Sequence, residues 1–134
     1  VGSEMCIRDR SIVLGYRDEL FLNEEFEPYG TVYLSSEDGM HGTKGNVIDA
    51  IKACAVTGDI IYACGPTPML RGIKQYAAEQ NIRCEISLEE KMACGVGACL
   101  ACVCQTKNVD EHSKVHNARI CADGPVFYAE EVEL

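Results

Sequence analysis

The sequence predicts an α/β fold in which a parallel-sheet segment is followed by a small β-rich unit. Strand and helix signals alternate between residues 11 and 88, and strands separated by helices of about ten residues are typical of parallel sheets. After residue 88 the alternation ends: cysteine, glycine and alanine dominate residues 93–102, and only short strand-like pieces follow. The length of 134 residues leaves room for one ordinary domain or two small ones.

Each element of the first segment has its own signal. Apolar and β-branched runs predict strands, and apolar residues three or four apart predict helices. In the first helix Leu22 and Phe26 would form the buried face, and in the third Thr67 would cap an element that starts at Pro68. The expected strands are 12–14, 31–34, 59–63 and 82–87. One helix is expected over 18–26, a second begins at 47 and ends before 57–58, and a third begins at 68. A glycine-rich loop is expected over 35–45.

The second segment, residues 89–134, is too small to bury much apolar surface by itself. Its strand-like pieces are 103–106, 118–120 and 126–128, and they surround a polar turn near 108–112. A unit of this size needs a metal, a disulfide or a docking partner to be stable.

The first ten residues show no usable periodicity. We interpret residues 1–10 as a non-native leader of the kind that translated sequencing adaptors leave; a frayed native terminus is the alternative. Under this interpretation Cys6 has no role, and the natural protein continues upstream of residue 11.

Charge and composition exclude several classes of protein. The chain has 12 Lys and Arg and 21 Asp and Glu residues, so its formal net charge is -9. This negative charge argues against nucleic acid as a partner. No apolar run reaches the roughly 20 residues that cross a bilayer, and the 47% hydrophobic content is enough for a packed core. We therefore expect a cytoplasmic protein that binds neither membrane nor nucleic acid.

The nine cysteines are the unusual feature. An odd number without a signal peptide favours a metal site over a disulfide framework. Four of them follow the spacing Cys-x4-Cys-x2-Cys with a distant fourth, which is the plant-type pattern for a [2Fe–2S] cluster. The expected ligands are Cys94, Cys99, Cys102 and Cys121.

The residues between these cysteines fit the same chemistry. Gly95 and Gly97 permit backbone angles that other residues avoid, while Ala98 and Ala101 leave space beside the sulfides. Structural zinc is the rival metal, since it also takes four thiolates, although its sites more often pair two short knuckles. A zinc-stabilised, non-enzymatic module therefore stays open as an alternative.

The remaining cysteines have simpler interpretations. Cys104 follows Cys102 by two residues on an expected strand, so it should face away from the cluster as a small packing residue, with replacement of Cys121 as the less favoured reading. Cys54 and Cys84 lie in helical and strand patterns, and we expect both to be buried hydrophobes.

A second motif, Cys64-Gly65-Pro66, joins a strand to a helix. In open α/β sheets ligands bind beyond the carboxyl ends of the strands, where helix N-termini offer unpaired N–H groups. A plain strand-to-helix connection with a buried thiol is the structural alternative.

Three segments together resemble the electron transfer subunits of NAD-linked, B-type dihydroorotate dehydrogenases: 62–69 (YACGPTPM), 87–102 (SLEEKMACGVGACLAC) and 121–127 (CADGPVF). The resemblance covers residues 11–134. It implies a ferredoxin reductase-like protein with an FAD-binding barrel, a nicotinamide-nucleotide domain and a C-terminal [2Fe–2S] domain. Residues 11–88 would be the C-terminal part of the nucleotide domain and 89–134 the cluster domain. The barrel and the glycine-rich phosphate turn are missing, so we expect an N-terminally truncated chain.

The resemblance also implies roles for single residues. Cys94, Cys99, Cys102 and Cys121 would be the cluster ligands, and Cys64, Gly65 and Pro66 would lie beside the nicotinamide ring.

Arg17 would contact a phosphate or ribose of NAD, with a surface pair to Asp18 or Glu19 as the alternative, and the loop 38–45 would border the nucleotide. No catalytic residue is assigned. The role of Glu89 and Glu90 stays open, and His41, His112 and His116 lack ligand spacing and are expected to be solvated.

The implied function is electron transfer in pyrimidine (UMP) biosynthesis. Electrons would pass from an FMN-containing catalytic subunit through the [2Fe–2S] cluster and FAD to NAD+, in a heterotetramer. Related iron–sulfur flavoprotein reductases that serve sulfide, hydrogenase or ferredoxin share these motifs and remain alternatives. Without the FAD domain the present chain should be inactive by itself, and the missing phosphate turn leaves NAD against NADP undecided.

Overall fold

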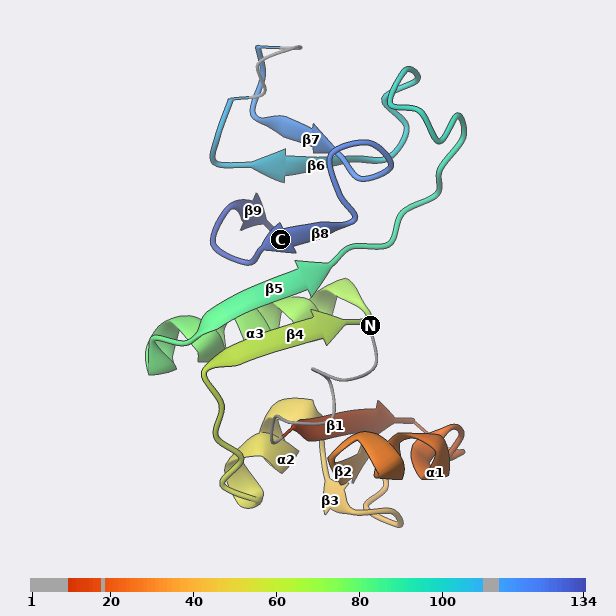
Figure 1. Ribbon diagram of the computed structural model, residues 1–134, viewed down its shortest axis with the longest axis vertical. Helices are drawn as coiled ribbons and strands as arrows, with labels where there is room; N and C mark the ends of the chain where they lie inside the picture. The colour runs from red at the N-terminus through yellow and green to blue at the C-terminus, as the bar shows by residue number, and fades with distance from the viewer. Residues whose placement is uncertain (1–9, 18, 110–113) are drawn as a thin grey trace. The chain divides into compact units, whose positions relative to one another are not determined.

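The computed structural model describes residues 10–17, 19–109 and 114–134. It divides into two compact units, Val1–Gly58 and Asp59–Leu134, which are described separately (Figure 1). Residues 1–9 of the expected leader, Asp18 and His112 lie outside the described residues, as does most of the turn predicted near 108–112.

Unit 1 is built on a parallel sheet of three strands in the order β1-β2-β3, which comprise Ser11–Tyr16, Thr31–Ser36 and Thr43–Lys44. The parallel pairing of β1 with β2 confirms the expectation from the alternating pattern. The short strand β3 falls inside the segment predicted as loop. Helix α2, Val47–Ala53, packs against all three strands of the sheet with Val47 and Ala50 buried, and the Asn46 side chain caps its first turn.

The helix predicted over 18–26 is mostly absent. Only α1, Asn23–Phe26, and the 3-10 turn η2, Glu27–Tyr29, are helical, and Leu22 lies in the left-handed region at φ 60°. The expected buried face is wrong, since Leu22 and Phe26 are both exposed. The Tyr16 hydroxyl donates to the Phe21 carbonyl at 2.6 Å and the two rings meet edge to face, so tertiary contacts hold the start of this segment as a loop.

Unit 2 begins with a mixed sheet in the order β4-β5-β8. Strands β4, Ile60–Cys64, and β5, Arg83–Ser87, are parallel as predicted, and β8, Val126–Tyr128, adds to β5 in antiparallel orientation. Helix α3, Thr67–Gln80, lies against one face of this sheet, with Leu70, Ile73 and Ala77 buried (Figure 1). Its N-cap is Pro66 rather than Thr67, because the helix begins one residue earlier than predicted and needs no side-chain cap there.

A second sheet completes unit 2. Strands β6, Val103–Thr106, β7, Asn117–Arg119, and β9, Val132–Glu133, pair antiparallel in the order β7-β6-β9. The first two were predicted within a residue or two, whereas β9 was not. Ile120 and Val132 are fully buried beside this sheet. The Arg71 and Lys74 side chains of α3 donate to the carbonyls of Leu134 and Val132, which ties the C-terminal segment to the helix.

The boundary predicted at residue 88 lies inside unit 2, since β8 from the second segment pairs with β5 from the first. The chain is thus a mixed α/β protein with parallel and mixed sheets. No helix within the described ranges is long and apolar enough to cross a membrane.

Candidate metal centre

The loop 94–102 winds tightly between β5 and β6. Three of its residues have positive φ: Gly95 at 69°, Gly97 at 77° and Leu100 at 57°. A left-handed backbone costs a non-glycine residue about 1–2 kcal/mol, so the two glycines are placed where the curvature demands them. The predicted conformational role of Gly95 and Gly97 is confirmed.

The curvature turns backbone N–H groups toward the first cysteine sulfur. The Val96 N–H donates to the Cys94 Sγ at 3.4 Å. Hydrogen bonds from the backbone of Val96 and Cys99, then from the Cys99 side chain and the Ala98 backbone, lower the pKa of the Cys94 thiol from 9.0 to about 6. The loop therefore favours a thiolate at Cys94, the form that binds metal.

The fourth predicted ligand joins the others from a different part of the chain. A hydrogen bond with the Cys102 side chain, followed by burial, raises the pKa of the Cys121 thiol, and the neighbouring Cys94 acts in the same direction. The Gly97 backbone opposes this shift by hydrogen bonding to Cys121. The structure therefore brings the four thiols into one neighbourhood, although 18 residues separate Cys102 from Cys121 in the sequence.

The donor set suits a binuclear centre. Cys99 is among the groups that lower the pKa of Cys94, and Cys102 is the main group that raises the pKa of Cys121, so the thiols lie as two neighbouring pairs. A [2Fe–2S] cluster takes two protein ligands on each iron. Over the described part of the chain, no three His, Cys, Asp or Glu side chains are placed to share a single metal ion. With a cluster bound, the Val96 N–H on the Cys94 sulfur would supply one of the hydrogen bonds to sulfur that stabilise the negative charge of iron–sulfur sites.

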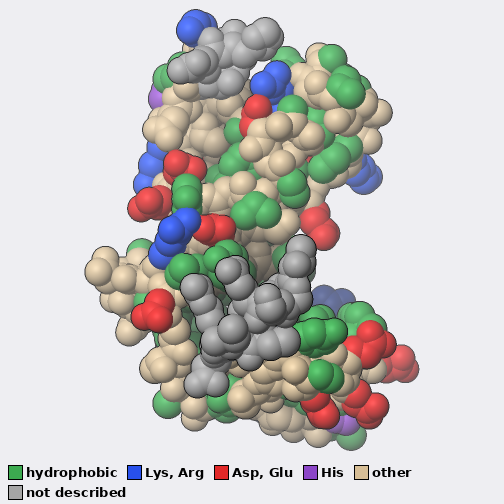
Figure 2. All heavy atoms as spheres, in the orientation of Figure 1, with side chains coloured by type: hydrophobic (Ala, Val, Ile, Leu, Met, Phe, Trp, Pro, Cys, Tyr) green, Lys and Arg blue, Asp and Glu red, His purple; other side chains and the backbone are tan. Residues whose placement is uncertain are grey.

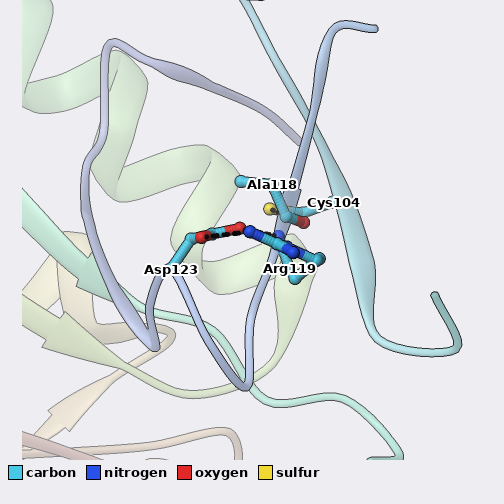
Figure 3. Close-up of polar contacts among 4 residues, drawn as sticks. All are labelled: Cys104, Ala118, Arg119 and Asp123. Carbon is cyan, nitrogen blue, oxygen red and sulfur yellow. Dashed lines mark hydrogen bonds and ion pairs between the residues drawn. The ribbon is translucent and has the colours of Figure 1, made fainter. Parts of the chain in front are cut away.

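The other cysteines differ in burial: Cys84 is buried, Cys104 is half-buried and Cys54 is exposed. The Cys104 thiol donates to the Ala118 carbonyl at 3.6 Å on the neighbouring strand, and burial raises its pKa, as expected for a packing residue (Figure 3). Cys84 is buried as predicted, and burial raises its pKa too. The prediction for Cys54 is wrong: it ends the short helix α2 and is exposed.

Sequence reasoning missed one ion pair next to Cys121, the fourth expected ligand. The Arg119 guanidinium donates to both carboxylate oxygens of Asp123, each at 2.9 Å (Figure 3). These two residues lie two positions before and two positions after Cys121 in the sequence. The spacing of four residues was visible in the sequence, but nothing in it showed that the intervening residues form a turn rather than a strand.

The predicted nucleotide turn lies at the carboxyl end of β4. Gly65 has φ 152°, a backbone angle that residues with side chains rarely adopt, and a Cβ there would lie 2.5 Å from the movable Cε of Met69. The backbone angle therefore favours glycine at this turn. Cys64 is exposed rather than buried, which excludes the buried-thiol alternative. Its thiol donates to the Glu89 Oε1 at 3.8 Å.

A cavity of about 420 Å³ opens beside this turn within unit 2. The turn contributes Gly65, Pro66 and Thr67, and the segment before the cysteine loop contributes Leu88, Glu89 and Glu90. Two motifs that are distant in the sequence therefore line one concave surface.

Arg17 belongs to unit 1 and is highly exposed. Its guanidinium lies 3.9 Å from the Glu37 carboxylate. Glu37 is therefore the surface partner that the structure gives to Arg17, in place of Asp18 or Glu19, which the sequence suggested.

In the loop that follows, the Met40 N–H donates to Asp38 at 2.9 Å and lowers the pKa of that carboxyl. His41 donates its backbone N–H to the buried Ser36 hydroxyl, and His116 Nδ1 lies 2.9 Å from the Lys107 carbonyl.

Comparison with known proteins bears on the same residues. The family model of the iron–sulfur cluster binding domain of dihydroorotate dehydrogenase B matches residues 89–133, which contain all four thiols. The electron transfer subunit of dihydroorotate dehydrogenase B (NAD(+)) from Caldanaerobacter subterraneus subsp. tengcongensis is 46% identical over 121 residues. The chain is a relative of these electron transfer subunits. The resemblance identified in the sequence is confirmed.

These matches cover nearly all of this chain but only about half of each relative. The alignment with the Caldanaerobacter electron transfer subunit covers 90% of this chain and 48% of that protein. The subunit from Fusobacterium nucleatum is 43% identical over 129 residues, which cover 92% of this chain and 47% of that protein. The chain thus spans about half the length of the electron transfer subunits it matches.

A solved structure extends the comparison to the fold. It comes from a study of flavin-based electron bifurcation by an NADH-dependent reduced ferredoxin-NADP oxidoreductase, and it matches with a TM-score of 0.79 and 29% identity. The match covers 93% of this chain and 44% of that one.

Proposed function

We propose that Cys94, Cys99, Cys102 and Cys121 hold a [2Fe–2S] cluster, and that the chain carries electrons as part of the electron transfer subunit of a dihydroorotate dehydrogenase B. The observation that carries the proposal is the convergence of two thiol pairs with the inward N–H groups of the loop 94–102. The match of residues 89–133 to the cluster-binding family supports it.

The bound cluster would supply one-electron transfer, which a protein side chain cannot provide. The chain's own residues would hold it and shape its surroundings. Hydrogen bonds from Val96, Ala98 and Cys99 to the Cys94 sulfur would spread the negative charge of the ligands. Buried Cys102 would shield one side from water, while exposed Cys94 and Cys99 would keep the other side close to the surface.

The exposed side of the loop is apolar, which suits a protein partner. Val96 and Leu100 are 76% and 59% exposed, and Figure 2 shows hydrophobic side chains gathered on the part of unit 2 that carries the loop. Exposed apolar residues at such a position mark interaction surfaces. We infer that the partner is the FMN-containing catalytic subunit, and that the two form a heterotetramer.

The second binding region would serve the other end of the electron path. Gly65 and Pro66 line the cavity at the end of β4, where α/β sheets bind their ligands, and the exposed Cys64 directly precedes them. In the full-length protein we assign this turn to the nicotinamide of NAD facing FAD, and Arg17 to a phosphate or ribose of the nucleotide. The exposed position of Arg17, paired loosely with Glu37, leaves its guanidinium accessible to an anion.

The cellular setting follows from the thiols. All eight cysteines in the described residues are free, and free thiols persist in reducing compartments. We place the protein in the cytoplasm, where its product would serve pyrimidine synthesis.

Metal analysis of the purified chain tests the cluster. We expect about two irons and two acid-labile sulfides per chain, a brown colour, and an electron paramagnetic resonance signal only after reduction. One zinc per chain with no sulfide and no visible absorption would overturn the assignment.

The wider activity is tested on a protein that spans the whole length of the electron transfer subunits the chain matches, together with the catalytic subunit. Dihydroorotate-dependent reduction of NAD+ that disappears when the cluster is removed is the expected result. Reduction of NAD+ by sulfide or by reduced ferredoxin, with no response to dihydroorotate, would assign the subunit to a different reductase. The same assay with NADP+ decides the nucleotide preference.

A further inference from the structure

The fourth expected ligand, Cys121, depends on contacts that the other three do not need. Cys94, Cys99 and Cys102 lie on one nine-residue loop whose own backbone shapes it. Cys121 arrives on a separate turn after β7, so its sulfur can meet the others only if that turn is held in place.

The turn is closed by a ring of hydrogen bonds between two residues on either side of Cys121. The Arg119 carbonyl accepts the Asp123 N–H at 2.7 Å, while the Arg119 N–H donates to the Asp123 Oδ2 at 2.8 Å. The guanidinium adds two more bonds to the same carboxylate through Nε and Nη2, both at 2.9 Å (Figure 3). A two-pronged Arg–carboxylate pair of this kind fixes orientation as well as distance.

The same turn also contacts the segment that holds the other ligands. The Ile120 N–H donates to the Cys102 carbonyl at 2.9 Å, and the Ile120 side chain is 1% exposed. Across the turn, a Cβ placed at Gly97 would lie 2.9 Å from the Cβ of Ala122 and 3.4 Å from the Arg119 Nη1. The turn therefore has little freedom to shift relative to the loop 94–102.

We propose that Arg119 and Asp123 are positioning residues for the cluster: their ion pair holds the turn that presents Cys121 against the loop of the other three ligands. The inference rests on the proposed function, because it concerns how the cluster is retained. It adds residues that neither the cysteine spacing nor the comparisons point to.

The test compares Arg119→Gln and Asp123→Asn with the parent chain and with a matched control. Arg83→Gln is the control, because it removes an Arg–Glu pair, 2.7 Å to Glu85, together with the contact of Arg83 with Tyr128, elsewhere in the same unit. Each protein is reconstituted with iron and sulfide, and the loss of visible absorption is followed after adding the chelator EDTA. Loss of a supporting contact around a metal ligand typically weakens retention about 10- to 100-fold, so bleaching should be at least about 10-fold faster in both variants and unchanged in Arg83→Gln.

Two further measurements separate positioning from a general loss of stability. Arg119→Lys keeps the charge but has a single ammonium in place of the planar fork, so it should restore part of the retention that Arg119→Gln loses. The electron paramagnetic resonance spectrum of the reduced cluster should broaden or shift in Asp123→Asn, because the geometry at Cys121 changes, and should stay unchanged in Arg83→Gln. The double variant should bleach no faster than the worse single one, because the two residues act as one unit.

Each outcome decides one question. If the parent chain takes up no iron and sulfide, the proposed function fails. If the parent holds the cluster and both variants bleach no faster than Arg83→Gln with unchanged spectra, the inference about the ion pair is wrong while the cluster assignment stands. Should Asp123→Asn not accumulate in folded form, the comparison of Arg119→Lys with Arg119→Gln gives the same decision.

Discussion

The thiol of Cys64 donates a hydrogen bond to the Oε1 of Glu89, with 3.8 Å between sulfur and oxygen. This contact links the end of β4 to the segment just before the cysteine loop, across 25 residues of sequence. Glu89 also lines the cavity beside Gly65 and Pro66. The structure thus places Glu89 beside the turn that we propose to face the nucleotide, whereas the sequence left its role open.

This contact should contribute little to folding. Cys64 and Glu89 are both exposed, and a hydrogen bond between exposed groups exchanges with water at small net gain. We expect Cys64→Ala and Glu89→Gln each to change the free energy of unfolding by less than about 1 kcal/mol in urea titrations. Ile86→Ala is the control: this fully buried side chain should cost about 2–5 kcal/mol. A loss at Cys64 as large as that at Ile86 would show that the thiol is part of the core.

Replacing one expected ligand should remove the cluster. In Cys99→Ser the hydroxyl replaces a soft thiolate donor, so iron and sulfide content after reconstitution should fall close to zero. Cys54→Ser changes an exposed cysteine of unit 1 and should leave both contents as in the parent chain. Normal iron content and visible absorption in Cys99→Ser would contradict the ligand assignment.

The two glycines of the loop should differ in their tolerance of alanine. Both have positive φ, so each substitution strains the backbone by about 1–2 kcal/mol. A Cβ at Gly95 meets open space, whereas one at Gly97 would press on Ala122, the neighbour of Cys121. We therefore expect Gly97→Ala to release iron to a chelator faster than Gly95→Ala. Equal release rates would contradict this expectation, because they would mean that the turn bearing Cys121 can move away from an added Cβ at Gly97 without loss of iron.

The metal-free chain should show a shifted pH profile at Cys94. Its pKa is lowered from 9.0 to about 6, chiefly by the Val96 N–H, so the thiolate should dominate at neutral pH. Alkylation of Cys94 by iodoacetamide, followed by peptide mass spectrometry, should reach half its maximal rate near pH 6 in the folded chain and near pH 9 in urea.

The same shift has a consequence for stability. Because the folded pKa is the lower one, the thiolate stabilises the folded metal-free loop fully above about pH 9, and this contribution is lost as the pH falls through about 6. Identical alkylation profiles in the folded chain and in urea would show that, in solution, the backbone N–H groups of the loop do not form hydrogen bonds with the Cys94 sulfur.

Local pattern was enough for much of this protein. The β-branched runs predicted β1, β2, β4, β5 and β8, because strand formation follows alternation and side-chain type over a few residues. The spacing of Cys94, Cys99 and Cys102 with two glycines predicted a tightly wound loop, and the positive φ angles of Gly95 and Gly97 agree. The same plant-type pattern predicted the distant Cys121 as the fourth ligand, and the family resemblance implied the same role.

Other features depended on contacts between distant residues. Leu22 and Phe26 have helical spacing, yet the contact of Tyr16 with Phe21 holds the preceding segment as a loop. Cys54 has the spacing of a buried residue, but α2 ends at Ala53 and leaves it exposed. The pairing of β8 with β5 joins two segments that the change of sequence pattern had separated.

The sequence by itself determined most of the strands, the helix α3 and the chemistry of the thiols, since these follow from residue type and short spacing. Only the tertiary structure decided which residues support that chemistry: Arg119 with Asp123 around Cys121, and Glu89 against Cys64. The physical reason is that a hydrogen bond requires two groups within about 3–4 Å, and for groups on different segments that distance is set by the packing of strands and turns rather than by their order along the chain.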